Sequence, residues 1–286
     1  MTPGDLGPVV VGVDGDDRSV TALCWAAYQA ELDNRPLILV HAQTEVNSWA
    51  LASGMVGAFA WDHPDIVARR VLDSAVDLAR RLAPGVVVTA RTEPVSPARL
   101  VLAEAGETSL IVLGNHGARL MTDVVVGTVC GTVAARASCP VIAVSGRPAW
   151  PDAPIVIGLD ESGVADRALD FALALAARRH VPVRLHHIRR HHTRAEGVQH
   201  PVFGEPYRYG WLRARHPEVP VRITCATGDP VAALADAAAD AQLLVIGTRG
   251  HSSAAGLLTG SVSHALLRKA PCALAIVPRT PQAPTW

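Results

Sequence analysis

The chain has 286 residues, of which 49% are hydrophobic and 18% charged, so it can bury the cores of two ordinary domains. Its 26 basic residues balance its 26 acidic ones, which argues against attraction to DNA or to an anionic membrane surface. No apolar run approaches the roughly 20 residues that span a bilayer, and the N-terminus lacks the pattern of a signal peptide. We therefore expect a cytoplasmic protein without membrane insertion.

The first half of the chain alternates short apolar runs with stretches rich in alanine and leucine. The runs predict strands at 8–14, 36–42, 86–90, 109–114 and 140–145, with helices at 17–33, 64–83, 96–106 and 127–137. Runs without polar alternation indicate strands buried on both faces, as in a parallel sheet covered by helices. Five such strands joined by helical crossovers predict a doubly wound, Rossmann-like α/β domain.

The second half repeats this plan. PIVIGLD at 154–160 matches PVVVGVD at 8–14, and residues 242–277 align without gaps with residues 109–144. The first pair lies 146 residues apart and the second 133, so the second copy is thirteen residues shorter in its middle. The repeat predicts two tandem domains, 1–148 and 149–286, that meet near the proline-rich stretch 147–154.

Polar and glycine residues end two of the predicted strands in each copy. Asp14 and Gly114 do so in the first copy, and Asp160 and Gly247 in the second. Doubly wound sheets bind ligands beyond the carboxyl ends of their strands, where the strand order reverses. We therefore expect the two residues of each pair to lie close together at such an edge.

A glycine motif follows the fourth strand of each copy and ends in a hydroxyl residue. Its members are Gly114, Gly117, Gly127 and Thr128 in the first copy, and Gly247, Gly250, Gly260 and Ser261 in the second. The glycines could serve turn geometry alone, because glycine readily adopts positive φ. The hydroxyl residue, however, precedes a predicted helix, whose free N–H groups attract phosphate. His116 and Arg249 occupy matching positions in the turns, where they either face the phosphates or lie exposed to solvent.

Other motifs of catalysis and nucleotide binding are missing. The sequence has no G-x-x-x-x-G-K-[ST], and no G-x-G-x-x-G follows the first strand, which disfavours P-loop hydrolases and dinucleotide dehydrogenases. We find no nucleophile elbow, no HExxH and no paired general acid and base. Any hydrolysis of ATP is therefore expected to be slow.

An aspartate at the end of the first strand, followed by G-x2-G-x9-G-[S/T] after the fourth, resembles the universal stress protein family. The resemblance covers nearly the whole chain, and the tandem arrangement of the chain is similar to that of the two-domain stress proteins of actinobacteria. It implies a fold like that of adenine nucleotide α-hydrolases and a site for ATP, with or without Mg²⁺. It implies that Asp14 and Val40 bind the adenosine in the first copy, and Asp160 and His186 in the second. It also implies that the glycine motif surrounds the ribose and the phosphates. In the family the last strands commonly pair domains, which implies an internal pseudo-dimer and a homodimer of it.

The function that the resemblance implies is that of an ATP-binding regulator or sensor in stress response or dormancy, with an unknown protein partner and at most slow ATPase activity. One alternative is an α-hydrolase-like enzyme that cleaves nucleotides. The other is an interaction scaffold that binds no nucleotide.

The loop DGDDRS departs from the family pattern, because Asp16 and Asp17 stand where small or hydroxyl residues are usual. Extra carboxylates near phosphate would weaken binding unless they face solvent or a metal. Glu161 follows Asp160 in the second copy, so the two sites need not be equally occupied.

Three further features have two interpretations each. HHIRRHH at 186–192 is either a solvated strand end or a metal site, which its arginines disfavour. The apolar segment 43–63 is either a flap over the crevice or a loop packed on the neighbouring domain. The five cysteines show no CxxC spacing, so most are expected to be core thiols rather than ligands or disulfides: Cys24, Cys130, Cys139, Cys225 and Cys272.

Overall fold

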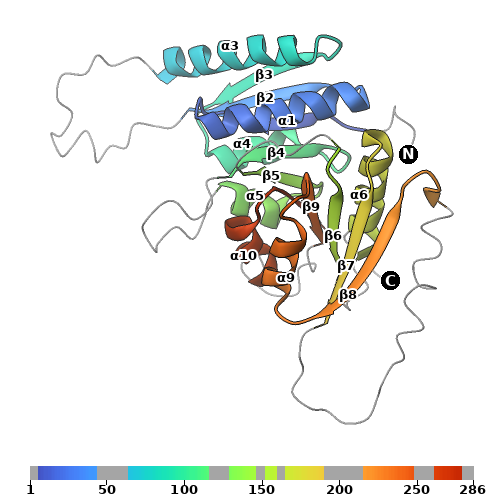
Figure 1. Ribbon diagram of the computed structural model, residues 1–286. Coiled ribbons are helices and arrows are strands. Elements are labelled where there is room, and N and C mark those ends of the chain that lie inside the picture. Colours follow the sequence, from blue (N-terminus) through green and yellow to red (C-terminus); the bar gives the residue numbers. More distant parts are fainter. Residues whose placement is uncertain are drawn as a thin grey trace, which may run out of the picture. The chain divides into compact units, whose positions relative to one another are not determined.

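The computed structural model describes residues 6–43, 64–115, 129–145, 152–159, 165–189, 215–247 and 261–278. The chain divides into two compact units, Met1–Val144 and Ser145–Trp286. Each unit is a parallel sheet of five strands with helices on both faces (Figure 1). The doubly wound α/β fold predicted from the sequence is confirmed in both halves.

The first unit orders its strands β3-β2-β1-β4-β5. Its elements are β1 (Val9–Gly12), α1 (Asp17–Asp33), β2 (Leu37–Ala42), α3 (Pro64–Leu82), β3 (Val88–Glu93), α4 (Pro97–Glu104), β4 (Leu110–Gly114), α5 (Val129–Arg136) and β5 (Val141–Val144). Helices α1 and α3 pack together on one face, and α4 and α5 on the other (Figure 1). The apolar runs of β1, β4 and β5 are buried because both faces are covered.

The predicted boundaries agree with the structure to within two residues except at β3. The prediction began this strand at the apolar run 86–90, but the strand starts at Val88 and continues to Glu93. Val86 instead closes a turn by donating to Ala83, and Val87 is 68% exposed. Among the described strands β3 pairs with β2 alone, so it is an edge strand, and its Arg91 and Glu93 are exposed.

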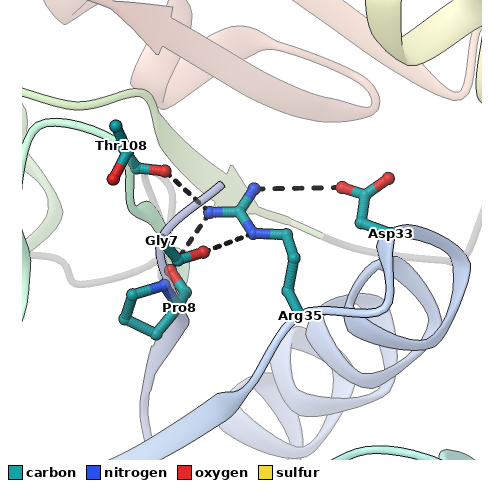
Figure 2. A network of polar contacts seen from close by, with 5 residues as sticks. All are labelled: Gly7, Pro8, Asp33, Arg35 and Thr108. Carbon is teal, nitrogen blue, oxygen red and sulfur yellow. Dashed lines mark hydrogen bonds and ion pairs between the residues drawn. The ribbon is translucent and has the colours of Figure 1, made fainter. Parts of the chain in front are cut away.

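A buried arginine joins three segments at the amino ends of the strands. Arg35, only 6% exposed, donates from Nε to the carbonyl of Gly7 at 2.6 Å. Its Nη2 donates to the carbonyls of Pro8 at 3.2 Å and Thr108 at 3.0 Å, while Nη1 lies 3.8 Å from the carboxylate of Asp33 (Figure 2). The guanidinium thereby ties the start of β1 to the turn before β2 and to the turn before β4.

The second unit has the equivalent strand order, β10-β9-β6-β7-β8. Its elements are β6 (Ile155–Leu159), α6 (Ala165–Arg179), β7 (Val183–Arg189), β8 (Val221–Thr227), α9 (Pro230–Ala237), β9 (Leu243–Gly247), α10 (Ser261–Lys269) and β10 (Ala273–Val277). Helix α6 packs on β6, β9 and β10, and α9 packs on β7 and against α10. Among the described helices of both units, none combines the length and apolar character needed to cross a bilayer.

The two units use different side chains at two equivalent places, the end of the first helix and the loops at the amino ends of the strands. Asn34 (φ 51°) follows the end of α1 and His180 (φ 54°) follows the end of α6, so a non-glycine residue takes the left-handed conformation after both helices. Where the first unit uses Arg35, the second uses Arg179, which donates to the amide oxygen of Gln242 at 2.5 Å. Gln242 in turn donates to the carbonyl of Ala153, just before β6.

Candidate functional site

The candidate site of the first unit lies at the carboxyl ends of β1, β2 and β4. Strand β1 is central: its Gly12 pairs with Val40 of β2, and its Val11 pairs with Val112 of β4. The strand order reverses between β1 and β4, which is where doubly wound sheets bind ligands. The chain leaves β1 at this edge and enters helix α1.

Asp14 is fixed in a tight turn directly after β1. Its Oδ1 accepts a hydrogen bond from the amide of Asp16 at 3.0 Å, and its own amide donates to Ser19 Oγ at 3.3 Å. The Ser19 hydroxyl is buried and donates to the carbonyl of Asp16 at 2.8 Å. Because the turn is held at both ends, the exposed carboxylate of Asp14 has a defined direction.

Asp16 caps the N-terminus of α1. Its Oδ1 accepts from the amide of Arg18 at 3.2 Å, which satisfies one of the free donors of the first turn. Asp16 and Asp17 are both exposed to solvent, so the two carboxylates that depart from the family pattern face outward. They also place negative charge at the start of α1, which makes this helix terminus unfavourable for phosphate.

Gly114 allows helix α1 to approach the end of β4. A Cβ atom at Gly114 would lie 2.9 Å from the carbonyl carbon and oxygen of Arg18, and 3.1 Å from the amide nitrogen of Ser19. Real Cβ atoms do not approach backbone this closely, so the position requires glycine. Gly114 and Asp14 therefore both contact the first turn of α1, as expected from the ends of their strands.

Helix α5 contacts Gly114 through a thiol. Cys130, 3% exposed, donates from Sγ to the carbonyl of Gly114 at 3.2 Å. Burial raises the pKa of the Cys130 thiol to about 12, so it stays protonated and can act as this donor. The amide of Asn115, the last residue described after β4, donates to the carbonyl of Val144 in β5 at 2.8 Å. The start of α5 at Val129 is thereby held next to the end of β4.

Val40 and the two residues after it complete the edge. The side chain of Val40 is buried, and its carbonyl accepts from the amide of Val13 at 2.9 Å. His41 Nδ1 lies 2.8 Å from the carbonyl of Val13. Backbone groups alternate in direction along a strand, so the N–H and C=O of Ala42 point toward the side of β1, beyond the last paired residue of that strand.

Sequence reasoning missed His41 and Ala42 because it assigned the adenosine contact to Val40, two residues before the end of the strand predicted at 36–42. The available signal was the repeated histidine in LVHA and LHHI, at the same distance from the paired glycine in each copy.

In the second unit, Gly247 ends β9 and pairs with Val277. His186 lies on β7 opposite Gly158, the position that Val40 occupies opposite Gly12. Its side chain is half-buried, and burial together with the charge of Arg184 lowers the pKa of His186 below its ordinary value. The next residue, His187, is buried and occupies the register position of His41.

The remaining predicted site residues lie outside the described part of the chain. They are His116, Gly117, Gly127, Thr128, Asp160, Arg249, Gly250 and Gly260. Ser261 is the first residue of α10, but its side chain is not described. The segment 44–63 is also outside, as are the last three residues of HHIRRHH. In the part that the structure covers, no group of three His, Cys, Asp or Glu side chains is placed to hold a metal.

The comparisons with known proteins agree with this architecture. The model of the universal stress protein family matches residues 6–145 and again residues 153–278. A universal stress protein of Mycobacterium tuberculosis is 30% identical over 281 residues, which is 92% of this chain and 94% of that protein. One from Mycolicibacterium smegmatis is 27% identical over 286 residues, covering 94% of this chain and 96% of the relative.

A solved structure supports the fold over nearly the full length. The crystal structure of a universal stress protein from Archaeoglobus fulgidus covers 95% of this chain and 96% of its own, with a TM-score of 0.73 and 17% identity. Shorter matches include universal stress proteins solved in complex with cAMP and with dAMP, which cover 49% and 47% of this chain. The two family matches account for both structural units, and the chain therefore belongs to the universal stress protein family as a tandem of two of its domains.

Proposed function

We propose that the chain binds ATP at the carboxyl edge of its sheets and acts as a regulator or sensor rather than as a fast enzyme. The observation that carries this proposal is the convergence of Asp14, Ala42 and Gly114 at the switch point of the first sheet. Each comes from the end of a different strand, which is the arrangement that binds nucleotides in doubly wound folds.

The groups at this edge suit the parts of adenosine. The Asp14 carboxylate is exposed and held in direction by the Asp16 amide, so it can accept hydrogen bonds from the hydroxyl groups of a ribose. Ala42 directs an N–H and a C=O to the same side of its strand. This donor and acceptor match the ring nitrogen and the amino group on one edge of adenine.

Electrostatics favours α5 over α1 as the binding place of the phosphates. The start of α1 already carries the carboxylates of Asp16 and Asp17. Helix α5 begins two residues after Gly127, has no acidic residue in its first turn, and is held beside Gly114 by Cys130. A helix start without acidic groups attracts phosphate.

The donor chemistry fits the Mg²⁺ that the resemblance implies. Mg²⁺ prefers one or two carboxylates together with phosphate oxygens and water. Asp14 and Asp17 are exposed carboxylates at the edge that would hold the nucleotide. Mg²⁺ bound there would offset the negative charge of these two carboxylates.

Binding at this edge couples to the stability of the unit, because a ligand that joins three strand ends stabilises the state in which they converge. A protein partner could recognise that state. A regulatory partner and a homodimer are part of the proposal, and light scattering of the purified chain with and without ATP tests the dimer.

The test is calorimetric titration and thermal unfolding with ATP, ADP and GTP, with and without Mg²⁺. We expect ATP to raise the melting temperature, with about 2.7 kcal/mol of stabilisation at a hundredfold excess over Kd. Asp14→Asn and Asp160→Asn, made singly and together, should weaken binding and show which unit is filled. Asp77→Asn, on the exposed side of α3, is the matched control.

The proposal is wrong if neither ATP nor ADP changes the melting temperature and no nucleotide co-purifies. Sustained release of AMP and pyrophosphate would instead favour the nucleotide-cleaving enzyme.

A further inference from the structure

We infer that His41 is a positioning residue of this site: by binding the carbonyl of Val13, its imidazole keeps the Ala42 N–H free to bind the base of the nucleotide. The inference rests on the proposed function, and it adds a residue that decides which base the edge accepts.

The hydrogen-bond ladder between β1 and β2 shows what His41 does. The amide of Val13 donates to the carbonyl of Val40, in the same pattern as the amide of Val9 to the carbonyl of Pro36. The next bond of a parallel ladder would run from the Ala42 amide to the Val13 carbonyl. That carbonyl instead has His41 Nδ1 at 2.8 Å, and no bond from the Ala42 amide to it is formed. A carbonyl only accepts, so Nδ1 carries the proton.

At Ala42 the other side of β2 is still part of the sheet. It pairs with Glu93 of β3, and the amide of Gln43 donates to the carbonyl of Glu93 at 3.0 Å. Strand β2 therefore continues past the point at which β1 turns away at Asp14. The result is a main-chain donor and acceptor at the end of β2, with the donor kept available by the imidazole next to it.

The second copy has a histidine at the same register position. His187 follows the residue paired with Gly158, as His41 follows the residue paired with Gly12. The preceding residues are unrelated, Val40 and His186. An imidazole at the same register position in both units, beside a position that varies, indicates a common role at the strand end. Ile188 takes the place of Ala42 there, and main-chain groups do not depend on the identity of that side chain.

The experiment compares His41→Leu with His41→Asn, since an Asn side chain can still donate to the Val13 carbonyl. Calorimetric titration gives Kd for ATP and for ITP, whose base has a carbonyl in place of the amino group. We expect His41→Leu to weaken ATP binding about tenfold, the effect of one hydrogen bond, with little change for ITP. His41→Asn should restore most of the affinity. Equal losses for ATP and ITP, or equal effects of Leu and Asn, would overturn the inference.

Amide exchange of the wild-type chain tests the same point without relying on a variant that folds. The Ala42 amide should exchange quickly without nucleotide and become protected when ATP is added. Strong protection in the nucleotide-free chain would show that the Ala42 amide is already bonded, and the inference would be wrong. If the wild-type chain binds no nucleotide by any method, the proposed function fails as well, whereas wild-type binding that His41→Leu leaves unchanged refutes only the role of His41.

Discussion

Arg35 donates a 3.0 Å hydrogen bond from Nη2 to the carbonyl oxygen of Thr108, a residue 73 positions later in the chain. The same guanidinium binds the carbonyls of Gly7 and Pro8, so one buried side chain satisfies acceptors of two loops at the amino edge of the first sheet (Figure 2). The site lies at the opposite, carboxyl edge. Residues at the amino edge should thus affect stability and leave ligand contacts untouched.

Replacing Arg35 by Met should lower the free energy of unfolding of the first unit by about 3 kcal/mol, because it removes the donor to the carbonyls of Gly7, Pro8 and Thr108 and the ion pair with the buried carboxylate of Asp33. Hydrogen exchange read by mass spectrometry resolves the two units. Arg99→Met, at an exposed position on α4, is the control and should change little. Equal exchange in the two variants would contradict the structural role of Arg35.

Gly114→Ala should destabilise the first unit by roughly 1–3 kcal/mol, the usual cost of overpacking. The new Cβ would lie 2.9 Å from the backbone of Arg18, so the first turn of α1 must move. Gly106→Ala is a matched control, because the nearest atom to its Cβ would be Ser109 Oγ at 4.0 Å. Thermal unfolding of the two variants measures the difference. A melting temperature for Gly114→Ala equal to that of the control would show that α1 does not pack as described.

The second unit should lose stability as the solution becomes acidic. Burial, with the charge of Arg184, lowers the pKa of His186 below 6.5, so the folded state disfavours the protonated ring. Below pH 6.5 the unfolded chain binds this proton and the folded unit resists it. Stability therefore falls as the pH drops from 6.5 through the lowered pKa, and is fully retained above 6.5.

Urea denaturation between pH 4.5 and 7.5 measures this dependence. His186→Gln should make the second unit less sensitive to pH, whereas His264→Gln, at an exposed position on α10, should leave the profile unchanged. Parallel profiles for wild type and His186→Gln would exclude this histidine as the source.

The thiols should react with iodoacetamide in an order set by burial. Cys225 and Cys24 are exposed and should be alkylated in the native chain, Cys24 more slowly than a free thiol because partial burial raises its pKa. Cys130 and Cys272 are buried, and burial raises the pKa of each to about 12, so they should react only after denaturation. Peptide mass spectrometry identifies the labelled residues. Rapid native labelling of Cys130 would argue against its contact with Gly114.

Much of the fold was predictable because its signals are local. Continuous apolar runs such as Leu110–Leu113 require burial on both faces, and alanine-rich stretches between them allow only helical crossovers, so the parallel sheet follows. The prediction that most cysteines lie in the core is correct for Cys130, Cys139 and Cys272, whereas Cys24 and Cys225 are exposed. The start of β3 was predicted wrongly because its apolar residues lie in a turn at the sheet edge.

The site was less predictable because its determinants act between strands. Gly114 is required because the backbone of Arg18 leaves no room for a Cβ atom, and no spacing in the sequence reveals this contact. The roles proposed for His41 and Ala42 depend on β2 extending beyond the last paired residue of β1, and only the strand register shows this. Likewise, in the sequence Asp16 is only a departure from the family pattern, whereas the geometry of the first turn identifies it as the N-cap of α1.

That cap has a consequence for how the edge distinguishes the two ends of a ligand. Two helices begin here, one closed by the carboxylate of Asp16 and one whose first turn carries no acidic residue. A nucleotide bound at this edge as proposed would therefore be oriented, because its anionic end would be repelled by the carboxylate at the start of α1. This orientation needs no additional contact with the ligand, because it arises from Asp16, the side chain that caps the N-terminus of α1.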